Sequence, residues 1–442
     1  FTFNFLQAQV TGVVKDAAGE PIPGANVFWM NTTNGVTTNE DGNFSIHKPA
    51  RSHMLVVSFI GFENDTIHVD KGNQQLDIVL REGVELSEVN VVTRKLGTMK
   101  LRTSVMNEDM ISSAELTRAA CCNLGESFVT NPSVDVSYSD AATGAKQIKL
   151  LGLSGTYVQM MTENIPNFRG AAAPYGLGYV PGPWMQSIQV SKGSSSVKNG
   201  YESITGQINV EFKKPQLPEA DWVSANLFAS STNRYEANAD ATVKLSKRWS
   251  TSLLAHYENE TKSHDSNDDG FVDIPRVEQY NVWNRWAYMG DHYVFQAGIK
   301  ALHETRNSGQ IAHGNTPSHD LYEIGIKTNR YEAFTKNAYI FDKEKNTNLA
   351  LILQGTLHNQ DANYGRKLYD VDQSNFYASL LFETELSKQH SLSAGLSFNY
   401  DGYDQNYRLT NQAEEGLTKK FVKESVPGAY VQYTFNLNDQ LM

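Results

Sequence analysis

The sequence lacks the features that would indicate an enzyme, a nucleic-acid-binding protein or a helical membrane protein. None of the G-x-S-x-G, H-E-x-x-H or P-loop patterns occurs in its 442 residues, so no enzyme activity is predicted. The net charge is −11 and no basic stripe is present, so nothing supports nucleic-acid binding. No run of about 20 apolar residues occurs, which excludes an ordinary membrane helix. A membrane β-barrel remains allowed, because its strands need only about 9–11 alternating residues each.

Cysteine is almost absent as well. Cys121 and Cys122 are the only two and are adjacent in sequence, so the chain has no disulfide framework. Thiolate and thioether groups are the ligands that Cu(I) and related soft ions prefer, and Met160 and Met161 follow in the same region. We therefore consider a copper or other soft-metal site at these four residues, with ordinary core packing as the alternative.

The first nine residues, FTFNFLQAQ, do not begin with methionine and combine an apolar tail with small residues. This pattern predicts the remnant of an export signal over residues 1–9. A short disordered arm is the alternative interpretation.

Residues 10–81 contain short β-prone runs such as VTGVV and MLVVSFIGF, separated by the turns AAGEPIPG, TNEDGN and DKGN. Strands at this spacing predict a small β-sandwich. The patterns G-x-V-x-D-x-x-G-x-P-I-P-G-A-N-V, T-N-E-D-G-N-F-S-I and L-V-V-S-F-I-G-F resemble the carboxypeptidase-regulatory-like domain, which is an accessory domain.

Residues 82–98 form a polar segment around a short β-prone core. Its position after the regulatory-like domain resembles that of the box that binds the energy-transducing protein TonB. An extended segment with free backbone groups can add a strand to a partner sheet. A plain interdomain linker is the alternative. The box-like residues are Glu88, Val89, Asn90, Val91, Val92 and Thr93.

Residues 99–216 mix a predicted helix, Ser112 to Thr130, with short strands and glycine-rich turns. The runs NLGESFVTNPSVDVSYSD, QIKLLGLSGTYVQMMTENIP and WMQSIQVSKGSSSVKNGYESITGQINVEFKKP resemble the α+β plug domain of TonB-dependent outer-membrane receptors. Strands are expected at Ser187 to Ser191 and up to Phe212. Three modules thus follow one another in the order of that family.

Residues 217–442 alternate between apolar and polar side chains. From Tyr235 to Leu245 the apolar residues fall on one face of a strand, and Glu236, Asn238, Asp240 and Lys244 fall on the other. Ten such segments are predicted, at about 222–229, 235–245, 249–257, 280–288, 293–302, 328–340, 349–358, 374–386, 391–400 and 425–436. They predict part of an antiparallel membrane β-barrel within a mainly β chain, with the apolar face toward lipid and the polar face toward the lumen and plug.

The lengths of the connections support this interpretation. The gaps after the second, fourth, sixth and eighth segments are short, and those after the third, fifth, seventh and ninth are long, at roughly 15–25 residues by inspection, as between periplasmic turns and outer loops. Aromatic residues also collect at strand ends, as an interfacial girdle would. Ten strands cannot close around a plug, because plugged barrels of this kind have about 22. We therefore interpret the chain as the N-terminal part of a longer receptor.

Two predicted outer loops carry candidate ligands. In DSNDDGFVD, Asp265, Asn267, Asp269 and Asp273 match positions 1, 3, 5 and 9 of a calcium loop, but position 12 is an arginine. A solvated acidic loop is the alternative. His303, His313 and His319 share another such loop and match no zinc signature, so scattered surface histidines are the favoured interpretation.

The resemblance implies a receptor in the outer membrane of a Gram-negative bacterium that imports a scarce nutrient. It implies TonB with its inner-membrane energising complex, outer-membrane lipid, the imported ligand and a surface lipoprotein as partners. The modest loops favour a metal, metal-chelate or haem-like ligand, and a glycan importer is the alternative. A secreted β-rich adhesion or structural protein is the alternative from another class. No cofactor is assigned beyond Ca²⁺ or copper at the two sites above.

Overall fold

The computed structural model describes residues 9–435, apart from residues 17–18, 31–34, 50–52, 60–61, 63–64, 70–74, 81–97, 101–106, 119–121, 130, 132–133, 154, 194–197, 199, 201, 216–221, 312–320, 388 and 411–417. The predicted signal remnant, the box-like residues 88–93 and Cys121 thus lie outside the described residues, save for Gln9. The chain divides into two compact units, one of residues 1–95 with 342–346 and the other of residues 96–341 with 347–442. None of the helices in the described ranges is long and apolar enough to cross a membrane.

The first unit is the β-sandwich that the sequence predicts. One sheet has the order β4-β1-β7 and the other has the order β3-β2-β5-β6. Their strands are β1 (Gln9–Lys15), β2 (Asn26–Trp29), β3 (Gly35–Thr37), β4 (Asn43–His47), β5 (Met54–Ser58), β6 (Asp65–His68) and β7 (Gln75–Val79). In β1 every second residue is buried, which places an apolar face between the two sheets.

The sandwich core and one of its turns follow directly from sequence. Trp29 is fully buried, and its indole Nε1 donates a 2.9 Å hydrogen bond to the carbonyl of His47. In the turn before β4, the Asn39 side chain accepts hydrogen bonds from the amides of Asp41 and Asn43, at 3.1 and 2.8 Å. Gly42 has φ +73°, and a Cβ there would lie 2.6 Å from the Val14 carbonyl oxygen, so the turn requires glycine.

The second unit begins with the plug. Its main sheet has the order β13-β12-β15-β14-β9-β8, and β10 pairs with β11 in a separate hairpin. The strands are β8 (Thr98–Lys100), β9 (Asn107–Ser112), β10 (Val134–Asp140), β11 (Ala145–Leu150), β12 (Val158–Thr162), β13 (Ile165–Pro166), β14 (Met185–Lys192) and β15 (Gly206–Phe212). Strands β14 and β15 confirm the two plug strands predicted from sequence.

The predicted helix over Ser112 to Thr130 is much shorter in the structure. Helix α1 (Ser113–Arg118) is followed by the single-turn 3-10 helix η1 (Leu124–Glu126). Asn123 precedes η1 with extended backbone, at φ −146° and ψ 174°, which is incompatible with a continuous helix. Four more 3-10 helices shape the plug loops: η2 (Gly155–Tyr157), η3 (Gly170–Ala172), η4 (Gly176–Tyr179) and η5 (Gly182–Trp184).

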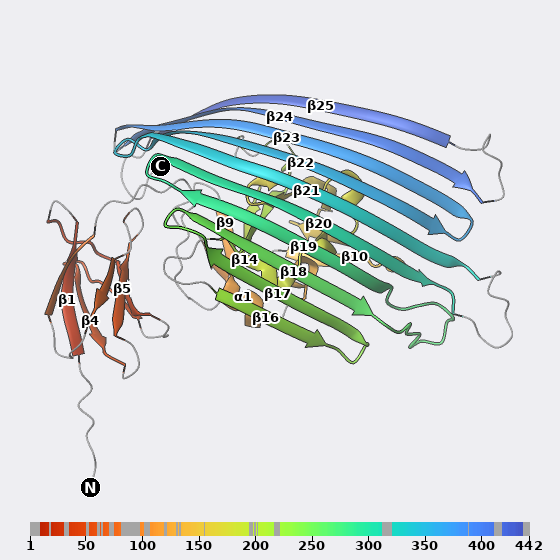
Figure 1. The fold of residues 1–442 in the computed structure, drawn as a ribbon, viewed down its shortest axis with the longest axis horizontal. Helices are drawn as coiled ribbons and strands as arrows, with labels where there is room; N and C mark the ends of the chain where they lie inside the picture. Colours follow the sequence, from red (N-terminus) through yellow and green to blue (C-terminus); the bar gives the residue numbers. More distant parts are fainter. Residues whose placement is uncertain are drawn as a thin grey trace, which may run out of the picture. The chain divides into compact units, whose positions relative to one another are not determined.

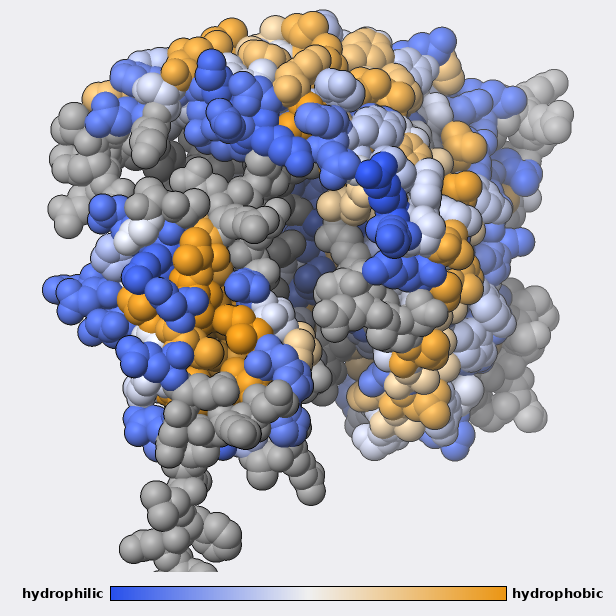
Figure 2. Space-filling view, turned by 60° about the vertical axis from the view of Figure 1, so that its left-hand side comes forward, coloured by the Kyte–Doolittle hydropathy of each residue, from blue (hydrophilic) through white to orange (hydrophobic). Residues whose placement is uncertain are grey.

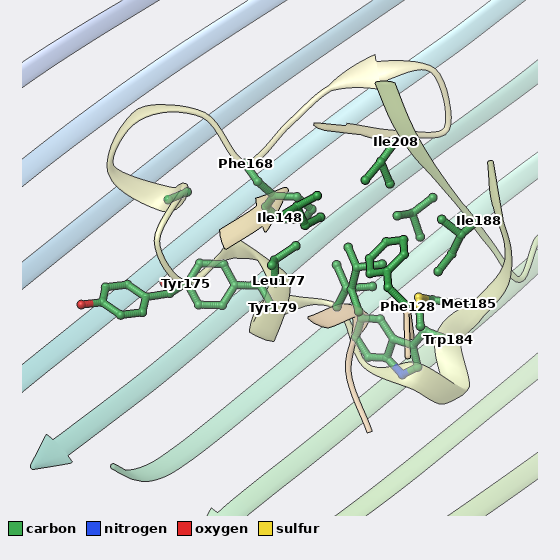
Figure 3. Packing of buried hydrophobic residues seen from close by; sticks show 14 of the residues in the cluster. Phe128, Ile148, Phe168, Tyr175, Leu177, Tyr179, Trp184, Met185, Ile188 and Ile208 are labelled. Atoms are coloured by element: carbon green, nitrogen blue, oxygen red, sulfur yellow. The ribbon is translucent and has the colours of Figure 1, made fainter. Parts of the chain in front are cut away.

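A single apolar cluster holds the plug together. All residues of β15 are buried, as expected for a strand that lies inside the sheet and is covered on both faces. Figure 3 shows Phe128, Trp184 and Met185 gathered beside Ile188 and Ile208. The cluster also includes Leu254, Trp283 and other side chains of the large sheet, so the plug packs against the inner face of that sheet.

The large sheet contains ten antiparallel strands in consecutive order, as predicted (Figure 1). They are β16 (Trp222–Ala229), β17 (Arg234–Lys244), β18 (Trp249–Glu260), β19 (Arg276–Met289), β20 (Tyr293–Gly309), β21 (Glu323–Asp342), β22 (Thr347–Tyr364), β23 (Lys367–Ser387), β24 (His390–Leu409) and β25 (Thr418–Phe435).

The two faces of these strands have the polarity of a membrane barrel. In β17, Glu236, Asn238 and Asp240 are at most 4 % exposed, whereas Tyr235 and Val243 are 45 % and 41 % exposed. The buried face is therefore polar and the exposed face apolar, the reverse of a water-soluble sandwich. Figure 2 shows apolar residues along the outer surface of this sheet.

Several strands run further than the sequence predicts, and the longest extensions are at the ends away from the short turns. Strands β22 and β23 pair up to Tyr364 and Lys367, and only two residues connect them. The prediction of a long loop after the seventh strand is therefore wrong. Beyond the apolar band both faces meet polar surroundings, and the alternation that marks a strand disappears there while backbone pairing continues.

Candidate functional site

A cavity of about 250 Å³ lies between the plug and the outer ends of strands β17–β20. The ends of β18 and β20 that reach it lead into the connections 261–275 and 310–322, which are longer than the turns at the opposite end. The plug contributes η1, the β10–β11 hairpin and η4. The lining includes Cys122, Glu126, Tyr138, Lys146, Tyr175, Arg234, Glu258, Glu260, Glu304 and Arg306.

One side of the cavity is built around Arg234. Its guanidinium lies 3.0 Å from the Glu126 carboxylate of the plug, 2.7 Å from Glu236 and 2.8 Å from Glu258. We call these four residues the Arg234 cluster. Glu126 lies in η1 of the plug and Arg234 in β17, so this ion pair joins the plug to the sheet across 108 positions of sequence. Each carboxylate balances part of the buried positive charge.

The other side is built around Arg306 of β20. Its guanidinium lies 3.0 Å from Glu304 and donates a 3.2 Å hydrogen bond to the carbonyl of Thr143 in the plug hairpin. It also covers the ring of Tyr175, at 4.9 Å from the ring centroid. The hairpin approaches closely because Gly144 has φ +68°, and a Cβ there would lie 3.1 Å from Arg306 Nη1.

Two charged residues of the lining differ from the rest. Lys146 of the plug and Glu260 of β18 form no ion pair with any residue in the described ranges. The Lys146 ammonium lies 5.6 Å from the ring centroid of Tyr138, its cross-strand neighbour. Burial lowers the pKa of Lys146 from its ordinary value, since a partly buried ammonium is less well solvated. The cavity therefore offers one cation and one carboxyl group that have no ion-pair partner among the described residues, and the Glu260 carboxyl group accepts a hydrogen bond from the Val277 backbone.

Deeper in the interface, the plug inserts Glu163 into the sheet. Glu163 and Asn164 form a tight turn between β12 and β13, with φ of 50° and 62°. The Glu163 carboxylate lies 2.6 Å from Arg285 and 3.6 Å from Lys336, and Lys336 also donates a 2.7 Å hydrogen bond to the Glu163 carbonyl. We call Glu163, Arg285 and Lys336 the Glu163 cluster. Both Arg285 and Glu163 are almost completely buried, at 1 % and 3 % side-chain exposure.

The charges around Glu163 outweigh its desolvation. Burial alone would raise the pKa of this carboxyl group, but the attraction of Arg285 and Lys336 holds the pKa below its ordinary value. Arg285 also lies over the ring of Trp283, at 4.4 Å from the ring centroid. The carboxylate is thus ionised and held between two cations of the sheet.

Further contacts attach the plug to β21, β23 and β24. Asn167 accepts a 2.6 Å hydrogen bond from Arg330 and donates a 2.9 Å bond to Glu332. Arg169 lies 2.9 Å from Asp401, and the Gln373 side chain accepts a 3.1 Å hydrogen bond from the amide of Ala171 in η3. The polar inner face of the strands is therefore the surface that holds the plug.

The predicted soft-metal residues lie in different settings. Cys122 lines the cavity and is buried, and burial raises the pKa of its thiol. Metals bind the thiolate, so a raised pKa favours the packing interpretation. Met161 is fully buried in β12, and Met160 packs against the same apolar cluster. Soft-metal binding stays a prediction.

The calcium-like loop hydrogen-bonds to itself. Asp265 accepts from the amides of Asp269 and Gly270, at 3.1 and 2.9 Å, and Asp273 accepts a 2.7 Å bond from Ser266. Asn267 donates a 2.9 Å hydrogen bond to Asp269. Within the described ranges, no group of three or more His, Cys, Asp or Glu side chains is placed to hold a metal ion. Calcium binding here stays a prediction, and the hydrogen bonds favour the solvated-loop alternative.

The predicted histidine group is only partly visible. His303 lies on β20 rather than in a loop, and its Nδ1 is 2.7 Å from the Asn329 side chain. His313 and His319 lie outside the described residues. Sequence reasoning missed the cavity residues Lys146, Glu260 and Arg306. Lys146 lies on the plug hairpin, and Glu260 and Arg306 lie beyond the predicted strands 249–257 and 293–302, so the predicted polar faces did not include them.

Comparison with known proteins matches both N-terminal domains. Residues 10–92 match the model of the CarboxypepD_reg-like domain, and residues 100–207 match that of the TonB-dependent receptor plug domain. The TonB-dependent receptor SusC of Bacteroides thetaiotaomicron is 27 % identical over 245 residues, covering 52 % of this chain and 24 % of SusC. The TonB-dependent receptor P39 of Formosa agariphila is 38 % identical over 95 residues, covering 21 % of this chain and 9 % of P39.

Solved structures show the same fold. The alcaligin outer-membrane receptor FauA of Bordetella pertussis superposes with a TM-score of 0.62 at 14 % identity, covering 80 % of this chain and 58 % of FauA. The ferripyoverdine receptor of Pseudomonas aeruginosa gives 0.63 at 13 % identity, covering 82 % of this chain and 55 % of the receptor. The chain thus matches little more than half the length of these structures and about a quarter of SusC.

These findings identify the modules of the chain. It contains a CarboxypepD_reg-like domain followed by a TonB-dependent receptor plug domain, and its plug and large sheet have the fold of solved outer-membrane receptors. The relatives are receptors by name, in agreement with the prediction that the chain is not an enzyme.

Proposed function

We propose that the chain forms the plug-bearing part of an importer that captures a scarce nutrient at its outer face and admits it when TonB acts on the plug. The observation that carries this proposal is the cavity between the plug and the outer ends of β17–β20. A ligand bound there touches both the part that moves and the part that stays in the membrane. Its binding is thereby coupled to the position of the plug.

The charged contacts support a plug that can move without unfolding. Ion pairs and hydrogen bonds to the sheet can be exchanged for contacts with water as the plug shifts, whereas the apolar side chains that the plug packs on Leu254 and Trp283 of the sheet have no such replacement. TonB and its inner-membrane energising complex would act through residues 82–98, which carry the box-like segment Glu88 to Thr93.

The ligand class has two candidates. A metal chelate or haem-like compound is one, and a glycan delivered with the help of a surface lipoprotein is the other. A bare metal ion is disfavoured, since the described residues hold no group of three metal-binding side chains and the cavity is far larger than an ion. The secreted adhesion alternative is disfavoured by the apolar exposed face of β17 and its neighbours.

The test compares uptake by cells that carry the full-length receptor with uptake by cells from which its gene has been deleted. Ferric chelates, haemin and oligosaccharides of different composition are supplied singly at limiting concentration. The proposal expects receptor-dependent uptake of one class, abolished when residues 88–93 are deleted. Uptake that is unaffected by this deletion would show that the receptor does not depend on TonB in the proposed way.

A further inference from the structure

We infer that the cavity recognises an acidic group of the imported ligand through Lys146 and a neighbouring hydrogen-bond donor of the same ligand through Glu260. This inference rests on the proposed import function and adds the chemistry of the ligand to it. Seven charged side chains line the cavity. Two of them, Lys146 and Glu260, have opposite charges and no ion-pair partner among the described residues.

The other five charged groups are already engaged. Arg234 is shared by Glu126 and Glu258 within the cavity and by Glu236 below it. Arg306 is held by Glu304 and by a plug carbonyl. These groups form the walls, and an incoming ligand would have to break existing ion pairs to use them. The cost of leaving a buried charge unpaired makes that exchange unfavourable.

Lys146 is available to a ligand. It lies on β11, where its ammonium group lies 5.6 Å from the centroid of the Tyr138 ring. A ring face is a weak partner for a cation and leaves its three N–H donors free for charge-assisted hydrogen bonds. Burial lowers the pKa of Lys146, which means that an anion placed beside it would restore lost stabilisation of the ammonium.

Glu260 supplies the complementary half. It lies at the outer end of β18, across from Arg234, in the same cavity. Its carboxyl group already accepts a hydrogen bond from the Val277 backbone, and its remaining acceptor positions suit a hydroxyl or amine donor. Together the two residues fit a ligand in which an acidic group lies near hydroxyl or amine groups, within a cavity of about 250 Å³. A hydroxycarboxylate chelate and an acidic sugar both have this chemistry.

The experiment measures binding to the intact receptor purified from outer membranes in detergent. Two matched pairs of probes distinguish the sources: ferric citrate with ferrioxamine B, which carries an ammonium and no carboxylate, and 3′-sialyllactose with lactose. The inference expects the acidic member of one pair to bind at least about tenfold more tightly than its partner. The pair that shows the preference identifies a chelate or a glycan as the ligand.

Four variants test whether Lys146 and Glu260 cause the preference for an acidic probe. Lys146→Met is expected to abolish the preference, and Lys146→Arg to keep most of it. Lys149→Met, on the same strand but outside the lining, is the matched control and should bind like the wild type. Glu260→Gln should weaken binding of the preferred probe several-fold without altering the preference for an acid. Unchanged gel mobility of unheated samples checks that each variant is folded.

The outcomes distinguish a failure of the inference about acid recognition from a failure of the proposed import function. If neither acidic probe is preferred, or if Lys146→Met keeps the preference, the inference is wrong even where uptake depends on residues 88–93. If uptake does not depend on that segment, the proposed import function fails, whatever Lys146 binds.

Discussion

The β-sandwich and the ten-stranded sheet use the same alternation for opposite purposes. In β1 of the sandwich the apolar residues are buried and the polar residues exposed, whereas in β17 the carboxylate and amide side chains are buried and the tyrosine and valine are exposed. A period of two residues therefore identifies a strand without saying which face is inside. The surroundings decide: water around the sandwich, and lipid outside with a plug inside for the large sheet.

The largest expected effect comes from replacing a buried tryptophan of the sandwich by alanine, and the same replacement of an outward-facing tryptophan of the large sheet is the comparison. Trp29→Ala should lower the free energy of unfolding of the sandwich by about 3–5 kcal/mol, because it empties the centre of the core. Trp286→Ala should cost clearly less, since Trp286 is on the outward face of β19 and its ring is 40 % exposed. Hydrogen exchange of amides in β1 and in β19 measures the two effects. Equal losses would contradict the assignment of the faces.

The next prediction concerns the buried ion pair between Glu163 of the plug and Arg285 of the large sheet. Glu163→Gln leaves Arg285 buried without its carboxylate and should destabilise the plug–sheet contact by about 3–5 kcal/mol. The plug strand β12 should then exchange its amide hydrogens faster than in the wild type. The double variant Glu163→Gln, Arg285→Met should recover part of the loss, because no buried guanidinium remains unpaired. A double variant that is worse than the single one would show that Arg285 has another essential partner.

A charge placed on the exposed apolar face of the large sheet tests whether that face meets lipid. Leu253 lies on β18 between Trp249 at the short-turn end and Tyr257 toward the outer end, and it is 47 % exposed. Leu253→Arg should destabilise the membrane-embedded receptor by about 2–4 kcal/mol, as for a cation near the middle of the bilayer. Leu245→Arg, next to a short turn, is the control and should cost much less. Urea unfolding in lipid vesicles measures both, and equal costs would place Leu253 away from lipid.

The sequence carried enough information for the strands but not for the contacts between them and the plug. All ten strands of the large sheet and the reversal of their faces follow from alternation and from short turns such as SKR and GDH. The strand ends beyond the apolar band were missed because residues such as Asp361 and Asp370 meet polar surroundings on either face. Backbone pairing there has no signature in side-chain polarity.

The site was less predictable for a different reason. Glu126 and Arg234 are 108 residues apart, and Glu163 and Arg285 also come from separate domains. Nothing local in either segment indicates the other, because the pairing arises only when the plug enters the sheet. The single local indication is a carboxylate or cation on the polar face of a strand, which requires a partner once it is buried.

The Glu163 cluster should also respond to pH. The pKa of the Glu163 carboxyl group lies below the ordinary value of 4.5. The contribution of Glu163 to stability is therefore fully present above about pH 4.5 and is lost as the pH falls through the lower pKa of the folded protein. The urea midpoint of the wild type should therefore approach that of Glu163→Gln on acidification. The gap between the two proteins, rather than either midpoint, is the measured quantity, since other groups also titrate. A gap that widens below pH 4.5 would contradict the sign.

The smallest effect comes from an arginine–carboxylate ion pair at the surface. Arg248 and Asp291 lie 2.8 Å apart next to two short turns, but their side chains are 54 % and 70 % exposed. Arg248→Ala should change stability by no more than about 1 kcal/mol, and added salt should remove most of that change. The Glu163 cluster, shielded from ions by the plug and sheet, should keep its contribution in the same salt series. If both variants lose their effect equally in salt, the Glu163 cluster is open to solvent, and burial does not explain the difference between the two ion pairs.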